Sequence, residues 1–463
     1  MFFLIIALTV INCKILYSCD KEFYCSKDSS ETKIFVNKIL IIGNDVTKEE
    51  VILREIRTKE NDTTNIITLQ NDVLRLYNLG LFNKVEFLPL PAGNDKFNLI
   101  ITVSENFYIL PLPQAGFKEG DITKFWAGMN LMWRNFRGMN ETVNLNFGLG
   151  YEPFIYANYS NPWLGKNDHF FTNFSVGYSN TNNRNVFRED TVNSVLTKDD
   201  LQQYKLNNFN SSFTIGKYLT KFANVNASLG YNFLSVSENA NGRTISPDGK
   251  DSYLSFTAGF NYDKRNLYNY TTSGTYADIK YYKFGIFHNQ IDLNRVCLDL
   301  REFIPLNLFK NFSVTLASRL VTSNAIGGSM PVYLRESFGF DKIIRGWKDN
   351  VFDGENLLGL FTELRIPVIK PFLVDGKRHI IFNKFSILRN FSYRYGMFVT
   401  AFFDVGNTYN REDNIMDVHF RNGFGVGLNF LLPFDVVARI DLAARKQNSV
   451  YYSQFIFSLA SSF

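Results

Sequence analysis

Hydrophobic and polar residues alternate one by one along most of the chain after about residue 107. In Val143–Tyr151, Leu254–Tyr262 and Phe424–Phe430, every second residue is aliphatic or aromatic, and the residues between are Asn, Ser, Thr or Gly. The same period recurs at Val225–Phe233 and Phe312–Leu320. Period two is typical of β-strands with one apolar and one polar face. At roughly 22 residues per strand and connection, the region 106–463 predicts about sixteen antiparallel strands.

Residues 32–105 follow a mixed pattern and predict a small α+β domain. An apolar run at Ile34–Ile42 is typical of a strand. Thr47 is expected to cap a helix, with Glu50 three residues later completing a capping box. The elements that follow are a second helix and two strands, expected at Ile66–Leu79, Lys84–Leu88 and Phe97–Val103. The predicted order is therefore β-α-α-β-β.

The N-terminal residues contain a short apolar stretch followed by a polar tail. Met1–Ile11 has the length of a signal-peptide core and is too short to cross a membrane as a mature helix. We expect residues 1–18 to be a signal peptide and residues 19–31 to be a linker. Cys19 is an alternative site of lipid attachment, because Leu16–Cys19 is similar to a degenerate lipoprotein cleavage site. Ordinary cleavage nearby is the preferred interpretation.

The composition favours a transmembrane β-barrel. Aromatic residues make up 16% of the chain, with 46 Phe and 24 Tyr, yet the mean hydropathy is only −0.12. Strands with an aromatic lipid face and a polar lumenal face account for this combination. Beyond the N-terminal stretch there is no apolar run long enough for a spanning helix, so a closed barrel is the remaining architecture. The net charge of +5 forms no basic block, which argues against nucleic-acid binding.

The sequence shows no pattern of catalytic residues. G-x-S-x-G, H-E-x-x-H and a phosphate-binding glycine loop are missing, and the four histidines are widely scattered. A catalytic site inside the lumen would need a cluster of reactive residues that the sequence does not contain. We therefore expect no enzymatic activity, no cofactor and no bound metal.

An arginine and an aspartate in the second half of the chain are expected to pair. Arg345 stands beside Gly346 and Trp347 in the run Gly339–Lys348, and Asp404 is the single charge within Phe402–Gly406. A buried arginine needs an anion, and a carboxylate at membrane depth needs a cation. The pair would hold a lid loop near residues 335–356 inside the barrel. Such a pair either stabilises the barrel alone or also serves function through the position of the loop.

Strand alternation assigns the partners of this lock. If Phe403 and Val405 face lipid, their neighbours face the lumen, and the same argument turns Glu363 inward. Arg345 is then expected to form charge-assisted bonds to Asp404 and Glu363. Gly346 is expected to allow close approach to the wall, and Trp347 to pack against Phe402. The predicted lock thus consists of Arg345, Gly346 and Trp347 on the loop, with Glu363, Phe402, Asp404 and Gly406 on the wall.

Several short phrases occur in an order that identifies a known family. In the first domain, Leu76–Phe87 is similar to the junction between the second helix and the next strand of a POTRA domain, and Glu105 stands where such domains often carry an acid. The barrel phrases are Asn135–Gly138, Ser160–Leu164, Tyr262–Arg265, Pro331–Gly339, Ile344–Trp347 and Glu363–Pro367. The last strand resembles the C-terminal recognition signal of outer-membrane barrels, through Phe455, Phe457, Leu459 and Phe463. From residue 32 onward the chain resembles the BamA/TamA-type outer-membrane assembly and translocation superfamily.

This resemblance implies a location and a function. The barrel is expected in a bacterial outer membrane, with the POTRA-like domain in the periplasm, where it inserts β-barrel proteins through a seam between the first and last strands. The implied partners are outer-membrane lipid, unfolded β-barrel clients, and periplasmic chaperones or accessory lipoproteins. The alternatives are a dedicated polypeptide secretion pore, an insertase of an organelle outer envelope, and a surface barrel without a transport role. A single POTRA-like domain departs from the several that are typical of bacterial assembly factors.

Overall fold

The chain divides into two compact units. The computed structural model describes residues 33–93, 96–117, 123–165, 169–182, 196–197, 204–236, 243–267, 270–287, 291–309, 312–340, 342–375, 384, 392–432 and 436–458. The predicted signal peptide, linker and Cys19, together with Leu459 and Phe463, lie outside these residues. One unit comprises the chain up to Tyr108 with the turn Arg137–Asn140, and the other comprises Ile109–Phe136 and Glu141–Phe463. Within the described residues, no helix is long and apolar enough to cross a membrane.

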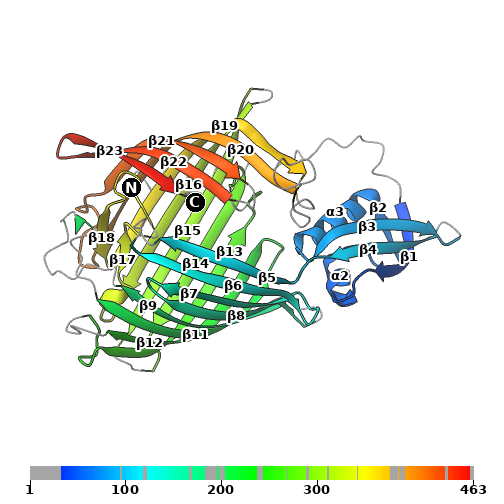
Figure 1. Ribbon diagram of the computed structural model, residues 1–463, viewed down its shortest axis with the longest axis horizontal. Coiled ribbons are helices and arrows are strands. Elements are labelled where there is room, and N and C mark those ends of the chain that lie inside the picture. Colours follow the sequence, from blue (N-terminus) through cyan, green and yellow to red (C-terminus); the bar gives the residue numbers. More distant parts are fainter. Residues whose placement is uncertain are drawn as a thin grey trace. The chain divides into compact units, whose positions relative to one another are not determined.

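The first unit is a four-stranded sheet with two helices (Figure 1). Its elements in chain order are β1 (Lys33–Ile42), α2 (Glu49–Glu55), β2 (Asp62–Asn65), α3 (Ile66–Asn78), β3 (Phe82–Pro91) and β4 (Lys96–Glu105). The sheet order is β2-β1-β4-β3, with β1 parallel to β4 and the other pairs antiparallel. The short strand β2 was not predicted, because its polar sequence Asp-Thr-Thr-Asn has no apolar face to mark it.

Apolar side chains from both helices and one face of the sheet fill the core of this unit. Members of this core that are at most 1% exposed include Val51, Ile52, Leu76, Leu99 and Ile101. Leu99 and Ile101 are two residues apart on the central strand β4, so they lie on the same face of the sheet. This face is therefore the one that the helices cover.

The predicted helix cap at Thr47 is wrong. Helix α2 begins at Glu49 after Lys48, and no side chain caps it. The Thr47 hydroxyl instead donates to Glu105 Oε1 at 2.5 Å, and the backbone amides of Val46 and Thr47 donate to the same carboxylate at 3.1 and 2.7 Å. Because three donors converge on it, Glu105 at the end of β4 fastens the turn that leads into α2.

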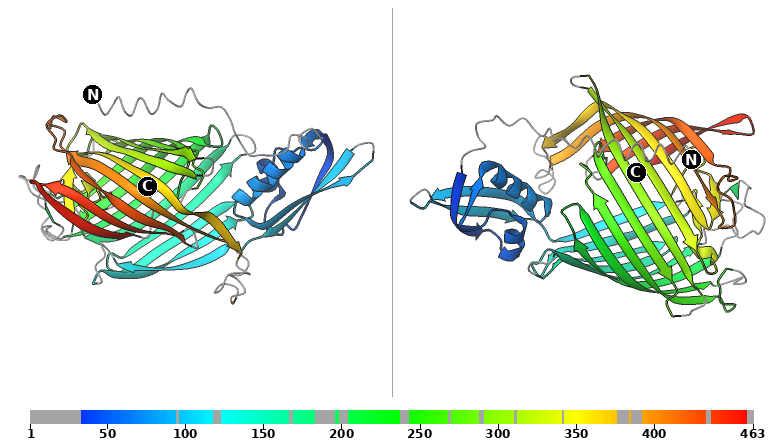
Figure 2. Two further views of the ribbon diagram at one scale, coloured as in Figure 1. Left: turned by 90° about the horizontal axis from the view of Figure 1, so that it is seen from above. Right: turned by 180° about the vertical axis from the view of Figure 1, so that it is seen from behind.

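The second unit is one antiparallel sheet of sixteen strands that curls into a barrel (Figures 1 and 2), which confirms the predicted fold class. Its strands are β5 (Ile109–Phe117), β6 (Phe125–Phe136), β7 (Glu141–Gly150), β8 (Phe154–Leu164), β9 (Phe170–Asn182), β11 (Lys205–Tyr218), β12 (Ala223–Val236), β13 (Lys250–Asp263), β14 (Gly274–Phe284), β15 (Leu293–Phe309), β16 (Phe312–Ile326), β19 (Asn356–Asp375), β20 (Ser392–Tyr409), β21 (Arg421–Leu432), β22 (Val436–Gln447) and β23 (Val450–Ser458). Neighbours in the sheet are neighbours along this series, from β5 to β23.

The two faces of the barrel wall differ as the alternation predicts. Outward residues include Leu149 and Leu229, which are 67% and 61% exposed. Inward positions on β8 to β11 carry amides and hydroxyls that bond to one another, such as Asn158 with Asn173 and Ser175 with Ser212. Inward positions on β15 and β16 instead carry ion pairs, for example Asp299 with Arg301 and Arg319. The lumen therefore has a neutral polar side and a charged side.

The connection between β16 and β19, residues 327–355, is the loop predicted near 335–356 and is here termed the lid. It contains the short helix η3 (Val332–Leu334) and the strands β17 (Glu336–Phe338) and β18 (Asn350–Gly354). β17 pairs with β18, and β18 also pairs with β10 (Leu196–Thr197). The lid therefore carries a small hairpin of its own, which positions the segment between β17 and β18.

Candidate functional site

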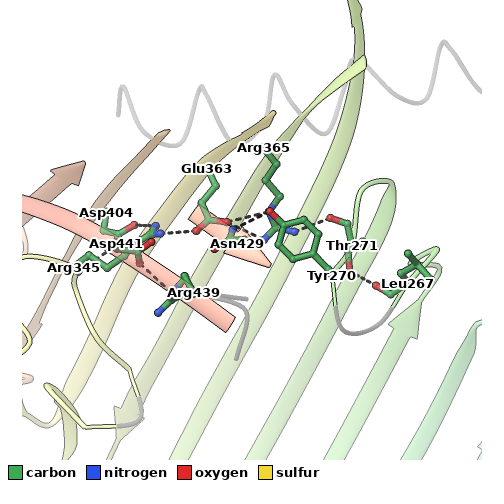
Figure 3. Close-up of polar contacts among 10 residues, drawn as sticks. All are labelled: Leu267, Tyr270, Thr271, Arg345, Glu363, Arg365, Asp404, Asn429, Arg439 and Asp441. Atoms are coloured by element: carbon green, nitrogen blue, oxygen red, sulfur yellow. Dashed lines mark hydrogen bonds and ion pairs between the residues drawn. The ribbon is translucent and has the colours of Figure 1, made fainter. Parts of the chain in front are cut away.

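Arg345 lies between β17 and β18 of the lid and binds two carboxylates of the barrel wall (Figure 3). Its Nε and Nη2 donate to the two oxygens of Asp404 at 2.7 and 2.6 Å, and its backbone N donates to Asp404 at 3.1 Å. Its Nη1 donates to Glu363 Oε1 at 2.5 Å. The predicted pairing of Arg345 with Asp404 and Glu363 is thus present, and the bond to Asp404 is bidentate.

These three side chains are almost completely buried. Arg345 is 3% exposed, Glu363 1% and Asp404 0%. Burial alone would lower the pKa of Arg345, but the negative charges of Asp404 and Glu363 outweigh it and raise the pKa above its ordinary value. The guanidinium also lies 3.7 Å from the ring centroid of Phe402, within the range of a cation–π contact. Breaking one partner out of such a pair leaves an uncompensated buried charge, so the site strongly favours the closed lid.

A second set of ions continues this network along the wall. Arg365, two residues after Glu363 on the same face of β19, donates to Glu363 Oε2 at 3.0 Å. On β22, Arg439 Nε lies 3.0 Å from Asp441 Oδ2. The cluster in Figure 3 therefore contains three cations, Arg345, Arg365 and Arg439, and three acids, Glu363, Asp404 and Asp441. Because the charges balance, the lid arginine completes a neutral cluster.

A turn between two strands further along the sheet also enters the network. Tyr270 and Thr271 lie between β13 and β14 and are 2% and 1% exposed. Arg365 Nη1 donates to the backbone oxygen of Thr271 at 2.7 Å, and Asn429 Nδ2 on β21 donates to the Tyr270 hydroxyl at 2.9 Å. These contacts bypass β15 and β16 in the sheet order, so the turn braces the lumenal side of the wall between β14 and β21.

The next two residues of the predicted lock, Gly346 and Trp347, contact different parts of the protein. Gly346 has a φ of +92°, and a Cβ there would lie 3.1 Å from Ala444 O, so it does allow the close approach that was predicted. The predicted packing of Trp347 on Phe402 is wrong. Trp347 instead packs edge-on against Phe352 with ring centroids 5.4 Å apart, and its Nε1 donates to Asn422 O at 2.8 Å. Phe352 takes this place because the hairpin of β17 and β18 folds back on the loop.

Two wall glycines make room for the lid. A Cβ on Gly423 of β21 would lie 1.6 Å from the backbone oxygen of Arg345. A Cβ on Gly406, one of the predicted wall partners, would lie 3.0 Å from the ring of Phe338, a residue of β17. Gly406 therefore accommodates the lid hairpin, while Gly423 accommodates the backbone of Arg345. Sequence reasoning missed Gly423, although the inward glycines at 423, 425 and 427 signal a wall that something approaches closely.

The two ends of the sheet are the other candidate site. Within the described residues, β5 pairs with β6 and β23 pairs with β22, and the two end strands do not pair with each other. Phe455 and Phe457 point outward and are 66% and 56% exposed, in the phase predicted from the sequence. The other two predicted residues of this strand, Leu459 and Phe463, lie outside the described part of the chain. Each end strand pairs on one side only, so the backbone donors and acceptors on its other side are available to a further strand.

The chemistry of these sites is that of binding and latching. The lock joins side chains whose charges compensate one another, so this arrangement can hold the lid to the wall. In the part of the chain that the structure describes, no three His, Cys, Asp or Glu residues are grouped to hold a metal ion.

A barrel of sixteen strands with a lumenal lid, preceded by a small α+β domain, defines a class of outer-membrane protein. The profile of the Omp85 superfamily domain matches residues 135–463, and that of the POTRA domain, described as a surface antigen variable number repeat, matches residues 34–106. The chain belongs to the Omp85 superfamily.

Curated relatives match shorter stretches. The outer membrane protein assembly factor BamA of Neisseria meningitidis is 39% identical over 75 residues, which is 16% of this chain and 9% of that protein. The chloroplastic outer envelope protein 80 of Arabidopsis thaliana is 26% identical over 134 residues, 26% of this chain and 18% of that protein. The matched stretches thus span less than a fifth of either relative.

Solved structures resemble the whole fold. BamA from Haemophilus ducreyi lacking POTRA domains 1–3 has a TM-score of 0.61 at 19% identity, covering 92% of this chain and 84% of that one. CdiB from Acinetobacter baumannii has a TM-score of 0.53 at 13% identity, covering 92% and 74%. At these identities the likeness concerns the fold alone.

Proposed function

We propose that this protein inserts β-barrel clients into the outer membrane through the seam between β5 and β23. The observation that carries the proposal is that β5 and β23, the two ends of the sheet, do not pair with each other within the described residues. Every backbone polar group must be satisfied inside a lipid bilayer. A client strand that pairs with an open edge meets this requirement while it folds.

In this proposal, strand β3 of the first unit is the edge that receives the client. β3 pairs only with β4, so its other side is open within the described residues. Pro89 and Pro91 cannot donate backbone hydrogen bonds, so an added strand would pair along the earlier part, Phe82–Leu88. In this proposal the POTRA domain lies in the periplasm and receives extended clients, from chaperones or accessory lipoproteins, by strand addition. The client's own folding supplies the free energy, and no catalytic residue is needed.

The similarity to the assembly factors named BamA favours insertion, and the lid that is locked across the lumen counts against an open pore. A dedicated polypeptide secretion pore is the second candidate, because displacement of the lid would open the lumen to an exported chain. The similarity to the chloroplastic outer envelope protein leaves a bacterial outer membrane and an organelle envelope as alternative locations. A bacterial outer membrane is the proposed location.

Depletion of the protein, followed by quantitation of all other outer-membrane barrels, tests the proposal. A broad loss of barrels is expected. Loss of one secreted protein with the barrels unchanged would overturn insertion in favour of a dedicated translocator.

Photo-crosslinking tests the seam directly. A photoreactive residue at Ile109 on β5, which is 57% exposed, is expected to capture a stalled client barrel. Leu229 on β12 is a matched control, because it is 61% exposed but belongs to a strand paired on both sides. Equal capture at both positions would contradict a specific role of the seam.

A further inference from the structure

The lid is fastened to the edge strand β23 by a contact that lies outside the lock. Gln454 uses both ends of its side-chain amide: Oε1 accepts from the backbone N of Lys348 at 3.0 Å, and Nε2 donates to Asp349 Oδ2 at 2.5 Å. Its neighbour Phe455 points outward, so Gln454 faces inward by alternation. The edge strand thus contributes a residue to the lid site.

The two strands before β23 hold the same segment of the lid. Trp347 Nε1 donates to Asn422 O on β21, and Arg445 on β22 donates to Gly346 O at 2.8 Å and to Asn350 Oδ1 at 2.6 Å. Both β21 and β22 have sheet partners on either side, so the sheet fixes them without the lid. β23 has a described sheet partner on one side only. The Gln454 contact therefore restrains β23, which within the described residues is otherwise held only by its backbone pairing with β22.

This contact lies close to the lock along the chain. Only Gly346, Trp347 and Lys348 separate Arg345 from Asp349. An extended backbone spans at most about 3.6 Å per residue, so the connection has little slack. If Arg345 leaves Asp404 and Glu363, the groups that bind Gln454 must move with it.

We propose that Gln454 is a positioning residue that couples the lid to the seam. With the lock closed, the lid holds β23 against the sheet, and displacement of the lid frees the edge for a client strand. The role in insertion rests on the proposed function, whereas the restraint on β23 is a property of the protein without any client. The two can therefore be tested separately.

Distances across the seam test the restraint in the purified protein. Spin labels at Ile109 and Phe455, in a background without native cysteines, report the separation of β5 and β23 in lipid vesicles by pulsed electron paramagnetic resonance. Gln454→Leu removes both hydrogen bonds to the lid and is expected to raise the population with a widened seam by about 30-fold, roughly fivefold for each ordinary hydrogen bond. Gln454→Glu, which keeps the size of the side chain and repels Asp349, is expected to act in the same direction and guards against a folding defect of the leucine variant.

Gln447→Leu is the matched control. It makes the same chemical change on the inward face of β22, and Gln447 has no described side-chain hydrogen bond to the lid. Its distance distribution is expected to equal that of the unchanged protein. If both Gln454 variants also match the unchanged protein, while Arg345→Ala widens the seam, Gln454 does not couple the lid to the seam.

Bridging the lid to the strand tests the consequence for activity. Cysteines at positions 349 and 454 joined by a short bis-maleimide are expected to reduce client insertion at least tenfold relative to the unbridged double variant. Insertion at the unbridged rate would overturn the coupling and leave the proposed function intact. If the unchanged protein inserts no client but Gln454→Leu still widens the seam, the proposed function fails and the restraint on β23 stands.

Discussion

At the scale of single residues, the lid is held by charges that have been removed from water. Arg345 and its two carboxylates are each at most 3% exposed, so neither side can lose its partner without leaving a charge uncompensated. The ion pair of Arg411 and Glu355 at the base of the lid differs, because its side chains are 28% and 16% exposed and water partly screens it. Two ion pairs on one loop should therefore contribute very differently to its stability.

Arg345→Ala is expected to destabilise the closed lid by about 3–5 kcal/mol, because Asp404 and Glu363 would remain buried without a cation. Trypsin cleavage within residues 327–355, measured in vesicles, should accelerate at least about 100-fold if cleavage follows local opening. The cleavage rate of Arg345→Lys should lie between those of the unchanged protein and Arg345→Ala, since lysine keeps the charge and loses the bidentate geometry. Arg411→Ala is the comparison variant: it removes a partly exposed ion pair and the hydrogen bonds to the lid oxygens of Gly327 and Gly328, and is expected to cost only about 1–2 kcal/mol. An unchanged cleavage pattern with intact activity in Arg345→Ala would refute the lock.

Gly423→Ala should also open the lid, although it removes no interaction. The new Cβ would lie 1.6 Å from Arg345 O, so the backbone of the lock must move away from β21. The control is Gly230→Ala on β12, where the closest contact would be the Ser255 hydroxyl at 2.8 Å, which can rotate aside. The same cleavage assay compares the two variants, and equal rates would show that β21 tolerates displacement of the lid.

At the scale of elements, the lid is a small folded unit with its own acid-sensitive contacts. Glu336 on β17 bonds to Lys342 and Ser323, and Glu355 bonds to Arg411. Burial would raise the pKa of Glu336, but Lys342 and Arg295 outweigh it and lower the pKa; the hydrogen bond from Arg411 lowers that of Glu355. Both carboxylates therefore favour the folded lid when they are ionised.

The pH dependence of the lid follows from these lowered pKa values. The stabilisation is fully present above the ordinary glutamate pKa of about 4.3 and is lost as the pH falls through the lower values in the folded protein. A spin label at the exposed Ser329 should show constant mobility from about pH 8 to 5 and higher mobility below about pH 4. Glu336→Gln should weaken this dependence. Loosening that is complete above about pH 5 would contradict the assignment.

The strands and their faces could be predicted from the sequence, because each strand touches lipid on one side and the lumen on the other. That local property placed Glu363 and Asp404 inside and Phe455 and Phe457 outside. Contacts across the lumen could not be predicted, since they depend on which strands lie opposite when the sheet closes. Tyr270 and Asn429 are 159 residues apart, and Asp349 and Gln454 are 105 apart. The error at Trp347 has a similar cause, because the hairpin that brings Phe352 near is too short to show a pattern.

At the scale of the whole molecule, the two units have separate cores, and the first should fold alone. Its buried cluster, from Val36 to Val103, comes entirely from residues 33–108. A fragment of residues 33–108 is therefore expected to unfold cooperatively on heating, as followed by circular dichroism. Ile101→Ala, which truncates a side chain that is 0% exposed, should lower its stability by about 2–5 kcal/mol. Broad, non-cooperative unfolding of the fragment would show that the domain needs the barrel.

The charge balance of the lock has an electrical consequence. With the lid in place, three arginines face three carboxylates on one side of the lumen. Withdrawal of the lid removes one positive charge and leaves Glu363, Asp404 and Asp441 facing two arginines. Rings of excess acid make a pore admit cations in preference to anions. In a planar bilayer under a salt gradient, the reversal potential of Arg345→Ala should therefore shift toward cation selectivity, so that the position of the lid could be read as a current.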